Sequence, residues 1–202
     1  MSLKQIAVAL NSAKNRLSQG KCEKAFARDK EGKPCDPDRP EAVCWCLHGA
    51  VMASVGANSS THNLATKYLR SRLPKPYASL WQFSDGMDHE YLVQWLENRI
   101  TELTLILALK YIKKGWCRGA FAKNKYGVNV AVSDDTAKYW CLDGAIQRAA
   151  MDLGSYNSSN ALLTLHSTDK SIESVWGYND RQENSDNIIK VLRKAISYVR
   201  SL

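Results

Sequence analysis

Apolar residues recur at every third or fourth position in several stretches of the chain, which is the spacing of one buried helix face. The pattern predicts a helix over residues 3–17, followed by Gly20, and a helix over residues 103–112, followed by Gly115. A glycine at this place commonly ends a helix. The same spacing predicts helices at residues 61–73, 90–100, 158–166 and 187–199.

Two segments between these helices alternate apolar and polar residues around a central glycine. They read AFARDKEGKPC (residues 25–35) and AFAKNKYGVNV (residues 120–130). This alternation favours two brief strands joined by a turn. The predicted fold class is therefore mainly α with short β-hairpin segments (α+β).

An uncommon phrase follows each hairpin, CWCLHGA at residues 44–50 and YWCLDGA at residues 139–145. Asp38 precedes the first phrase and Ser133 precedes the second. Both residue types are favourable helix N-caps. We therefore expect each phrase to lie inside a helix, with its Trp, Cys, Gly and Ala residues packed in the core.

The two phrases belong to an internal repeat. Adding 95 to the residue number aligns residues 20–50 with residues 115–145 without a gap, and 13 of the 31 pairs are identical. A constant offset of this kind is typical of a repeated structural unit. We expect two tandem homologous helical units of about 95 residues, the first at residues 1–100 and the second at residues 101–202.

The predicted junction between the units lies in a helical stretch. The helices predicted on its two sides can join into one rod over residues 90–114, about 37 Å long at 1.5 Å per residue. Alternatively, Thr101 and Glu102 can cap a fresh helix. The sequence leaves both arrangements open.

The charge distribution points to an anionic partner. The net charge is +8, and each predicted unit carries +4, from 14 basic and 10 acidic residues. No acidic residue lies between Glu102 and Asp134, a stretch that holds six Lys or Arg residues interleaved with aromatic residues. Basic and aromatic side chains together suit phosphate groups and unstacked bases.

We therefore predict ligand-binding residues in this stretch, with an echo in the first unit. They are Lys113, Lys114, Trp116, Arg118, Lys123, Lys125 and Tyr126, together with Lys24, Arg28 and Lys30. In the first unit, nearby Glu23, Asp29 and Glu31 dilute the positive charge. The alternative is a solvated basic surface whose aromatic residues turn inward.

Six cysteines, expected to be reduced in a chain of this size, allow three interpretations. Cys44 and His48 are four residues apart and could form a nucleophile and its base. A zinc site would use Cys22, Cys35, Cys44 and Cys46, although their gaps differ from the usual ligand spacing. Packing would bring together Cys22 with Cys46 and Cys117 with Cys141. We predict no catalytic residue, no metal and no cofactor.

Two carboxylates share the repeat offset. Asp85 and Asp180 each follow a tryptophan by four residues and precede a predicted helix. We expect them to act as helix caps. Neither unit offers an obvious second carboxylate that would make them a catalytic pair.

The second half of the chain resembles an uncharacterised bacterial and phage domain family of unknown function. The resemblance rests on GWCRGAFAKNKYG (residues 115–127), YWCLDGA and WGYND (residues 176–180). It extends over nearly the whole chain as two tandem copies, but the first copy departs from the pattern at Lys21 and at LWQFSD. It implies neither an activity nor a functional residue. The family context implies a role in host–phage conflict, as an anti-defence protein.

Together these features predict a non-enzymatic binding protein. Its partner is an anionic ligand, either nucleic acid or nucleotide, or another protein, and no membrane is involved. The N-terminal segment lacks the pattern of a secretory signal, so we expect a cytoplasmic location. The alternative is an enzyme acting on a nucleotide-like or phosphorylated substrate, with a cysteine as its nucleophile.

Overall fold

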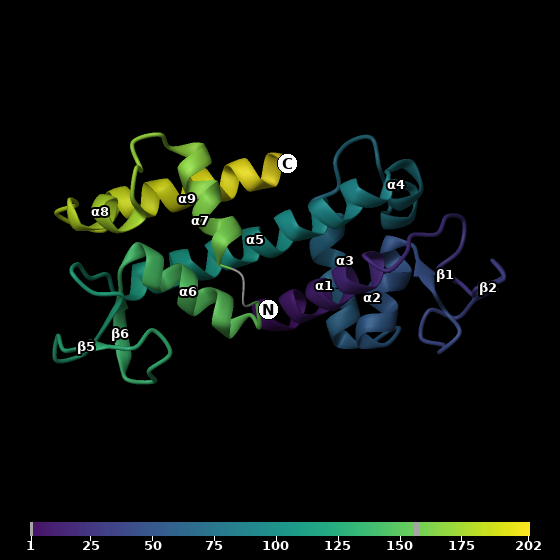
Figure 1. Cartoon of the computed structure of the whole chain (residues 1–202), viewed down its shortest axis with the longest axis horizontal. Helices are drawn as coiled ribbons and strands as arrows, with labels where there is room; N and C mark the ends of the chain where they lie inside the picture. Colours follow the sequence, from purple (N-terminus) through teal and green to yellow (C-terminus); the bar gives the residue numbers. More distant parts are fainter. Residues whose placement is uncertain (1, 156–157) are drawn as a thin grey trace. The chain divides into compact units, whose positions relative to one another are not determined.

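A computed structural model describes residues 2–155 and 158–202. Over these residues the chain forms nine α-helices and two three-stranded antiparallel sheets, so the predicted class, mainly α with short β segments, is confirmed (Figure 1). Contacts divide the chain into unit 1, Met1–Ile100, and unit 2, Thr101–Leu202. No helix within the described stretches is both long enough and apolar enough to cross a lipid bilayer.

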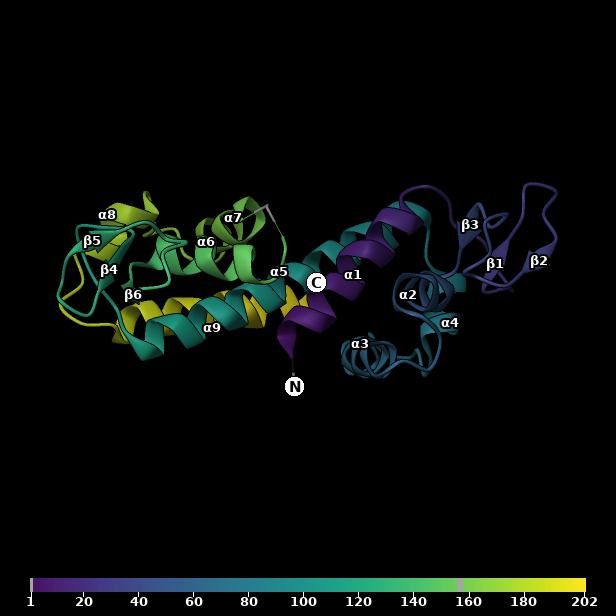
Figure 2. The same cartoon turned by 90° about the horizontal axis from the view of Figure 1, so that it is seen from below.

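Unit 1 holds four helices and the first part of a fifth. They are α1 (Leu3–Leu17), α2 (Leu47–Val55), α3 (Ser60–Arg70), α4 (Leu80–Gly86) and α5 (His89–Lys114). The predicted helix over residues 3–17 is confirmed, and it packs against α2 and α3 (Figures 1 and 2). Its buried face includes Ile6, Leu10 and Ala13, whose spacing is the periodicity read from the sequence.

Unit 2 contains the remainder of α5 and four further helices. They are α6 (Leu142–Asp152), α7 (Ser159–Thr168), α8 (Val175–Asp180) and α9 (Asp186–Ser201). The second part of α5 and α9 run side by side (Figures 1 and 2). Leu105 and Ile112 of α5 share a buried core with Ile146 of α6 and with Ile188 and Leu192 of α9.

The helix α5 decides between the two arrangements left open at the junction. It runs without a break from His89 to Lys114, so Thr101 and Glu102 do not begin a fresh helix. Both residues are buried along it. Gly115 follows its last residue and donates a backbone hydrogen bond to the Tyr111 carbonyl (3.0 Å).

Each unit has one small sheet of the same strand order. Unit 1 orders β1 (Ala27–Arg28), β2 (Pro34–Cys35) and β3 (Cys44–Trp45) as β2-β1-β3; unit 2 orders β4 (Ala122–Asn124), β5 (Asn129–Val130) and β6 (Ala137–Trp140) as β5-β4-β6. The two predicted hairpins are therefore confirmed. The third strand of each sheet was not predicted.

That third strand corrects the prediction for the repeated phrases, which do not lie wholly inside a helix. Trp45 belongs to β3, Cys46 is the N-cap, and α2 begins at Leu47. The Cys46 backbone stays extended because its N–H donates to the Phe26 carbonyl (3.1 Å). Its sulfur accepts a hydrogen bond from the Gly49 N–H (3.3 Å), which caps the helix.

The second phrase repeats this geometry. Cys141 is the N-cap of α6, and its Sγ accepts a hydrogen bond from the Gly144 N–H (3.2 Å). Asp38 and Ser133, the predicted caps, lie well before the two helices. A sulfur acceptor can replace the usual hydroxyl or carboxylate here because the Sγ of the extended residue faces the free N–H groups of the first turn.

Glycine in the phrase allows a close backbone approach. A Cβ atom on Gly144 would lie 2.0 Å from the Phe121 carbonyl oxygen, and one on Gly49 would lie 1.9 Å from the Phe26 oxygen. No heavier side chain fits at these distances without a backbone shift. The segment before the central strand is thus held directly against the first turn of the helix.

Candidate anion-binding site

In unit 2, the loop between α5 and β4 is shaped by two backbone features. The Cys117 N–H donates to the Trp140 carbonyl (3.2 Å), which ties the loop to β6. Gly119 adopts a φ of +70°, a left-handed conformation that suits glycine. These two features fix the backbone of the loop on either side of Arg118.

Asn179 of α8 holds this loop through side-chain hydrogen bonds. It is fully buried, and its Oδ1 accepts hydrogen bonds from Trp116 Nε1 (2.8 Å) and the Leu142 N–H (3.0 Å). Its Nδ2 donates to the Cys117 carbonyl (3.1 Å) and to Asp180 Oδ1 (2.9 Å). One side chain of α8 thereby joins the loop to the start of α6.

Asp180 completes the attachment and corrects the predicted capping role. Its Oδ1 accepts from the Gly119 N–H (3.1 Å) and its Oδ2 from Trp176 Nε1 (2.6 Å). It ends α8 rather than capping the next helix. Burial opposes its charge, but hydrogen bonds from Asn179, Gly119 and Trp176 and the charge of Arg118 outweigh it and lower the pKa of Asp180.

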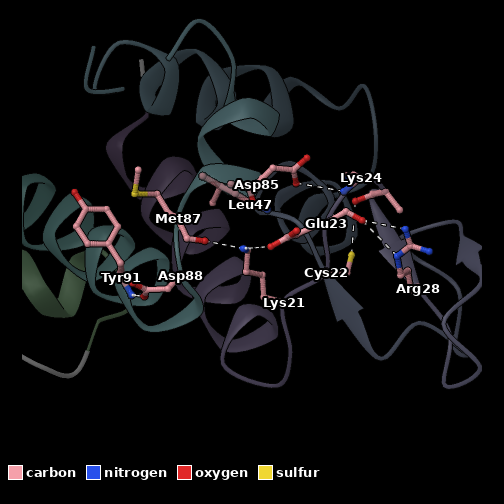
Figure 3. A network of polar contacts seen from close by, with 12 residues as sticks. Lys21, Cys22, Glu23, Lys24, Arg28, Leu47, Asp85, Met87, Asp88 and Tyr91 are labelled. Atoms are coloured by element: carbon pink, nitrogen blue, oxygen red, sulfur yellow. Dashed lines mark hydrogen bonds and ion pairs between the residues drawn. The ribbon is translucent and has the colours of Figure 1, made fainter. Parts of the chain in front are cut away.

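Asp85 makes the corresponding bond in unit 1 (Figure 3). Its Oδ1 accepts from the backbone N–H of Lys24 (3.3 Å), a residue whose φ is +57°. The start of α5 is served instead by Asp88, whose carboxylate accepts from the Tyr91 N–H (2.7 Å). Each aspartate therefore holds a loop that lies 61 residues before it in the sequence, and neither caps a helix.

The loop of unit 2 borders an open pocket of about 620 Å³. It is lined by Trp116, Cys117, Arg118, Gly119, Lys123, Tyr139 and Asp180. Three predicted ligand-binding residues, Trp116, Arg118 and Lys123, are thus brought together. The Arg118 guanidinium lies 5.9 Å from the Trp116 ring centre and donates to the Gln182 carbonyl (3.1 Å), which orients it along the pocket edge.

Four other predicted residues of unit 2 lie outside this pocket lining. Lys113 and Lys114 end α5, and the Lys114 Nζ lies 5.9 Å from the Tyr111 ring centre. Lys125 and Tyr126 form the turn after β4, where the ammonium lies 4.8 Å from the ring centre. Tyr126 is 77% exposed, the highest exposure among the large hydrophobic residues of the described chain.

The three predicted residues of unit 1 do not form an equivalent cationic pocket. Arg28 donates to the backbone carbonyls of Glu23 (3.0 Å) and Gly32 (2.7 Å), so its guanidinium is bound to the hairpin. Lys30 is exposed beside Glu31 (3.8 Å). The side chain of Lys24 lines a different pocket.

Charge is also balanced at the loop of unit 1. Lys21 stands at the repeat position of Trp116, and its Nζ donates to the Met87 carbonyl (2.6 Å) and to Glu23 (2.9 Å), as Figure 3 shows. This contact with Lys21, aided by the charge of Lys24, lowers the pKa of Glu23. Glu23 stands where unit 2 has Arg118.

The pocket that Lys24 lines in unit 1 has mainly apolar and aromatic side chains in its lining. Its volume is about 430 Å³, and its lining is Lys24, Ala25, Phe26, Pro34, Cys35, Asp36, Pro37 and Trp81. One cation and one carboxylate face it, so it has no excess of positive charge. The two units therefore place different chemistry beside loops that are held in the same way.

The geometry does not support a Cys44–His48 pair. Cys44 lies in β3 and faces the Arg28 carbonyl (4.0 Å), whereas His48 Nε2 lies 3.1 Å from His62 Nε2. Burial, aided by the charges of His62 and Arg70, lowers the pKa of His48. His48 is thus paired with a second imidazole in α3.

Four of the other thiols, those of Cys22, Cys46, Cys117 and Cys141, are buried. Burial raises the pKa of Cys141 to about 12, and burial together with Cys44 and Cys46 raises the pKa of Cys22 to about 12. Burial likewise raises the pKa of Cys46 and of Cys117. Among the described residues, no three His, Cys, Asp or Glu side chains are arranged to hold a metal ion, so the four-cysteine zinc arrangement is not formed.

Sequence reasoning missed two parts of the site, Asn179 and Tyr139. Both lie in motifs that were read from the sequence, WGYND and YWCLDGA. Asn179 could have been found from its position beside Asp180, in a segment that the repeated Trp and Asp already marked. Tyr139 belongs to β6, the third strand of its sheet, which was not predicted.

The fold and the site define a mainly helical protein with a cationic pocket beside one of its two small sheets. The chain belongs to the Family of unknown function (DUF6197), whose match covers residues 97–198. The match includes all the residues that line the pocket of unit 2. No curated protein and no solved structure matches the chain.

Proposed function

We propose that unit 2 binds a phosphate-bearing anion in the pocket beside the loop. The observation that carries this proposal is the meeting of Arg118 and Lys123 in a pocket whose only carboxylate, Asp180, already accepts three hydrogen bonds. The negative charge of Asp180 is directed toward those donors. The two cations remain available to a ligand.

The two cations suit phosphate in complementary ways. A guanidinium offers a planar set of donors that can bind two oxygens at once, and an ammonium acts as a compact charge. Arg118 is exposed and Lys123 is half-buried in the pocket. The 31 residues between Glu102 and Asp134 contain no carboxylate that could compete for these cations.

We also infer that the two units are tandem copies of one unit, and that unit 1 has lost the anion site. Corresponding residues support this inference through corresponding contacts: Cys46 and Cys141 cap helices, and Asp85 and Asp180 hold loops. Position 84 adds a testable pair, since Ser84 accepts from the Leu47 N–H (2.9 Å) as Asn179 does from the Leu142 N–H. Replacing Asn179 by Ser, discussed below, tests this equivalence.

Binding, and not thiol catalysis, is the activity that the geometry favours. A nucleophilic cysteine needs a thiolate at neutral pH. The pKa values of Cys22, Cys46, Cys117 and Cys141 are all raised. Cys117, which touches the pocket, is therefore a neutral thiol there.

Titration calorimetry with inorganic tripolyphosphate at low salt tests the proposal. The variant R118M/K123M removes both cations with little change in side-chain length, whereas K110M/K170M removes the same charge from exposed positions outside the pocket lining. Each charge-assisted hydrogen bond contributes about 1.5–3 kcal/mol, so the pocket variant should bind at least about tenfold more weakly. Equal affinity of the two variants, or no binding by the unchanged protein, would rule out the site.

A further inference from the structure

We infer that the ligand of unit 2 is a single-stranded nucleic acid, in which the phosphates meet the cations and the bases stack on exposed aromatic rings. This inference rests on the proposed anion site. It concerns the aromatic side chains around the pocket, which phosphate binding alone leaves without a role.

The pocket of unit 2 is open to solvent. It is lined on one side by the loop between α5 and β4 and on the other by β4 and β6. Sites for small molecules enclose most of their ligand. An open site gains affinity instead when a long ligand makes several contacts in succession, so its form favours a polymer over a free nucleotide.

Four aromatic side chains are exposed in or next to elements that form the pocket. Phe121 is 37% exposed, Tyr139 38%, Trp176 47% and Tyr126 77%. They lie in or next to β4, β6 and α8, which group at one end of unit 2 (Figures 1 and 2). Large aromatic rings are normally buried, so their exposure on the elements that form a cationic pocket indicates a ligand with flat apolar faces.

A cation and two aromatic rings lie on the outward side of the sheet of unit 2. Ala122, the first residue of β4, is buried, so its chain neighbours Phe121 and Lys123 lie on the opposite, outward side. Lys123 pairs across the sheet with Tyr139. A cation thus stands between two outward rings, an alternation that matches the alternation of phosphate and base.

The Trp176 ring is held in place by two contacts. Trp176 donates its Nε1 to Asp180, and its ring meets that of Phe121 edge to face with centres 5.3 Å apart. A ring fixed in this way loses little freedom when a base stacks on it. Bases in a duplex are already stacked on each other, so exposed rings select single strands.

Fluorescence anisotropy tests the inference with labelled dT12, rU12, a 12-base-pair duplex and an abasic 12-mer, with inorganic polyphosphate as competitor. We expect dT12 or rU12 to bind at least about tenfold more tightly than the duplex and the abasic strand. The dT12 and rU12 arms distinguish DNA from RNA. Tyr126→Ala and Phe121→Leu remove rings that do not line the anion pocket, so each should weaken single-strand binding severalfold and leave polyphosphate binding unchanged. Tyr198→Ala, at a 41% exposed ring on α9, should change neither.

The outcomes separate this inference from the proposal beneath it. If the abasic strand or the duplex binds as tightly as dT12, the aromatic rings have no part in recognition and the inference is wrong, although the anion site stands. The same conclusion follows if Tyr126→Ala and Phe121→Leu leave single-strand binding intact. If none of the probes binds, both the inference and the anion site are wrong.

Discussion

Replacing Asn179 with Ala should destabilise unit 2 more than most single substitutions do. Asn179 is fully buried, and it joins the Trp116 loop to the first turn of α6 through hydrogen bonds to the Cys117 carbonyl and the Leu142 N–H. Alanine cannot make either bond. Both backbone groups would stay buried without their present partner.

The magnitude follows from those two groups. A buried donor or acceptor that loses its partner costs about 1–3 kcal/mol, so the expected loss is about 2–6 kcal/mol in the free energy of unfolding. Domains of ordinary stability have about 5–15 kcal/mol in total. Asn179→Ser should lose about half as much, because Ser84 shows that a serine at the corresponding position can accept from the helix N–H.

Urea unfolding, followed by tryptophan fluorescence and circular dichroism, measures these losses. Ser84→Ala serves as the matched change in unit 1, because it removes the acceptor of the Leu47 N–H. If Asn179→Ala costs less than about 1 kcal/mol, below the usual cost of one unsatisfied group, the hydrogen bonds of Asn179 do not hold the loop. A serine variant as unstable as the alanine variant would contradict the equivalence of the two positions.

Three further outcomes follow from the cysteines and the imidazole pair. Cys141→Ala should lower the free energy of unfolding by about 1 kcal/mol through loss of the α6 cap, whereas Cys141→Ser keeps an acceptor for the Gly144 N–H and should lose less in the same urea assay. Mass spectrometry after brief iodoacetamide treatment of the folded protein should find Cys22, Cys46, Cys117 and Cys141 unmodified, and rapid labelling of any of them would contradict their burial. Because the pKa of His48 is lowered in the folded protein, the unfolded chain takes up its proton first as the pH falls, so the free energy of unfolding should be constant above the ordinary histidine pKa of about 6.5 and decline below it. His48→Phe should flatten this decline. An unchanged pH profile in that variant would show that another group causes the decline.

The sequence predicted the elements whose signal is local. Residues 3–17 form a helix because an apolar face recurs through four turns, and both hairpins form because alternation meets a glycine turn. The elements that depend on distant partners were mistaken. Trp45 and Cys46 read as helical, yet their backbone pairs with residues near Phe26 and stays extended. A strand of two residues has no periodicity that a sequence could display.

The site was predicted in part for the same reason. Charge and aromatic content indicated the segment that holds Trp116, Arg118 and Lys123. They did not indicate which of its cations line the same pocket. Asp180 looked like a cap because a cap acts within three residues, whereas its true partner is the Gly119 N–H. The repeated Trp and Asp mark the segment, but the distant partners of these hydrogen bonds cannot be read from the neighbouring sequence.

The two units separate the residues that shape the loop from those that give it chemistry. The loop turns through a positive φ at Lys24 and at Gly119, and an aspartate accepts the N–H of that residue in each unit. At the flanking repeat positions the side chains differ in charge, with Glu23 in unit 1 and Arg118 in unit 2. Because the backbone geometry persists while the charge reverses, we expect the proposed difference in anion binding between the units to arise from the side chains on the loop and not from its shape.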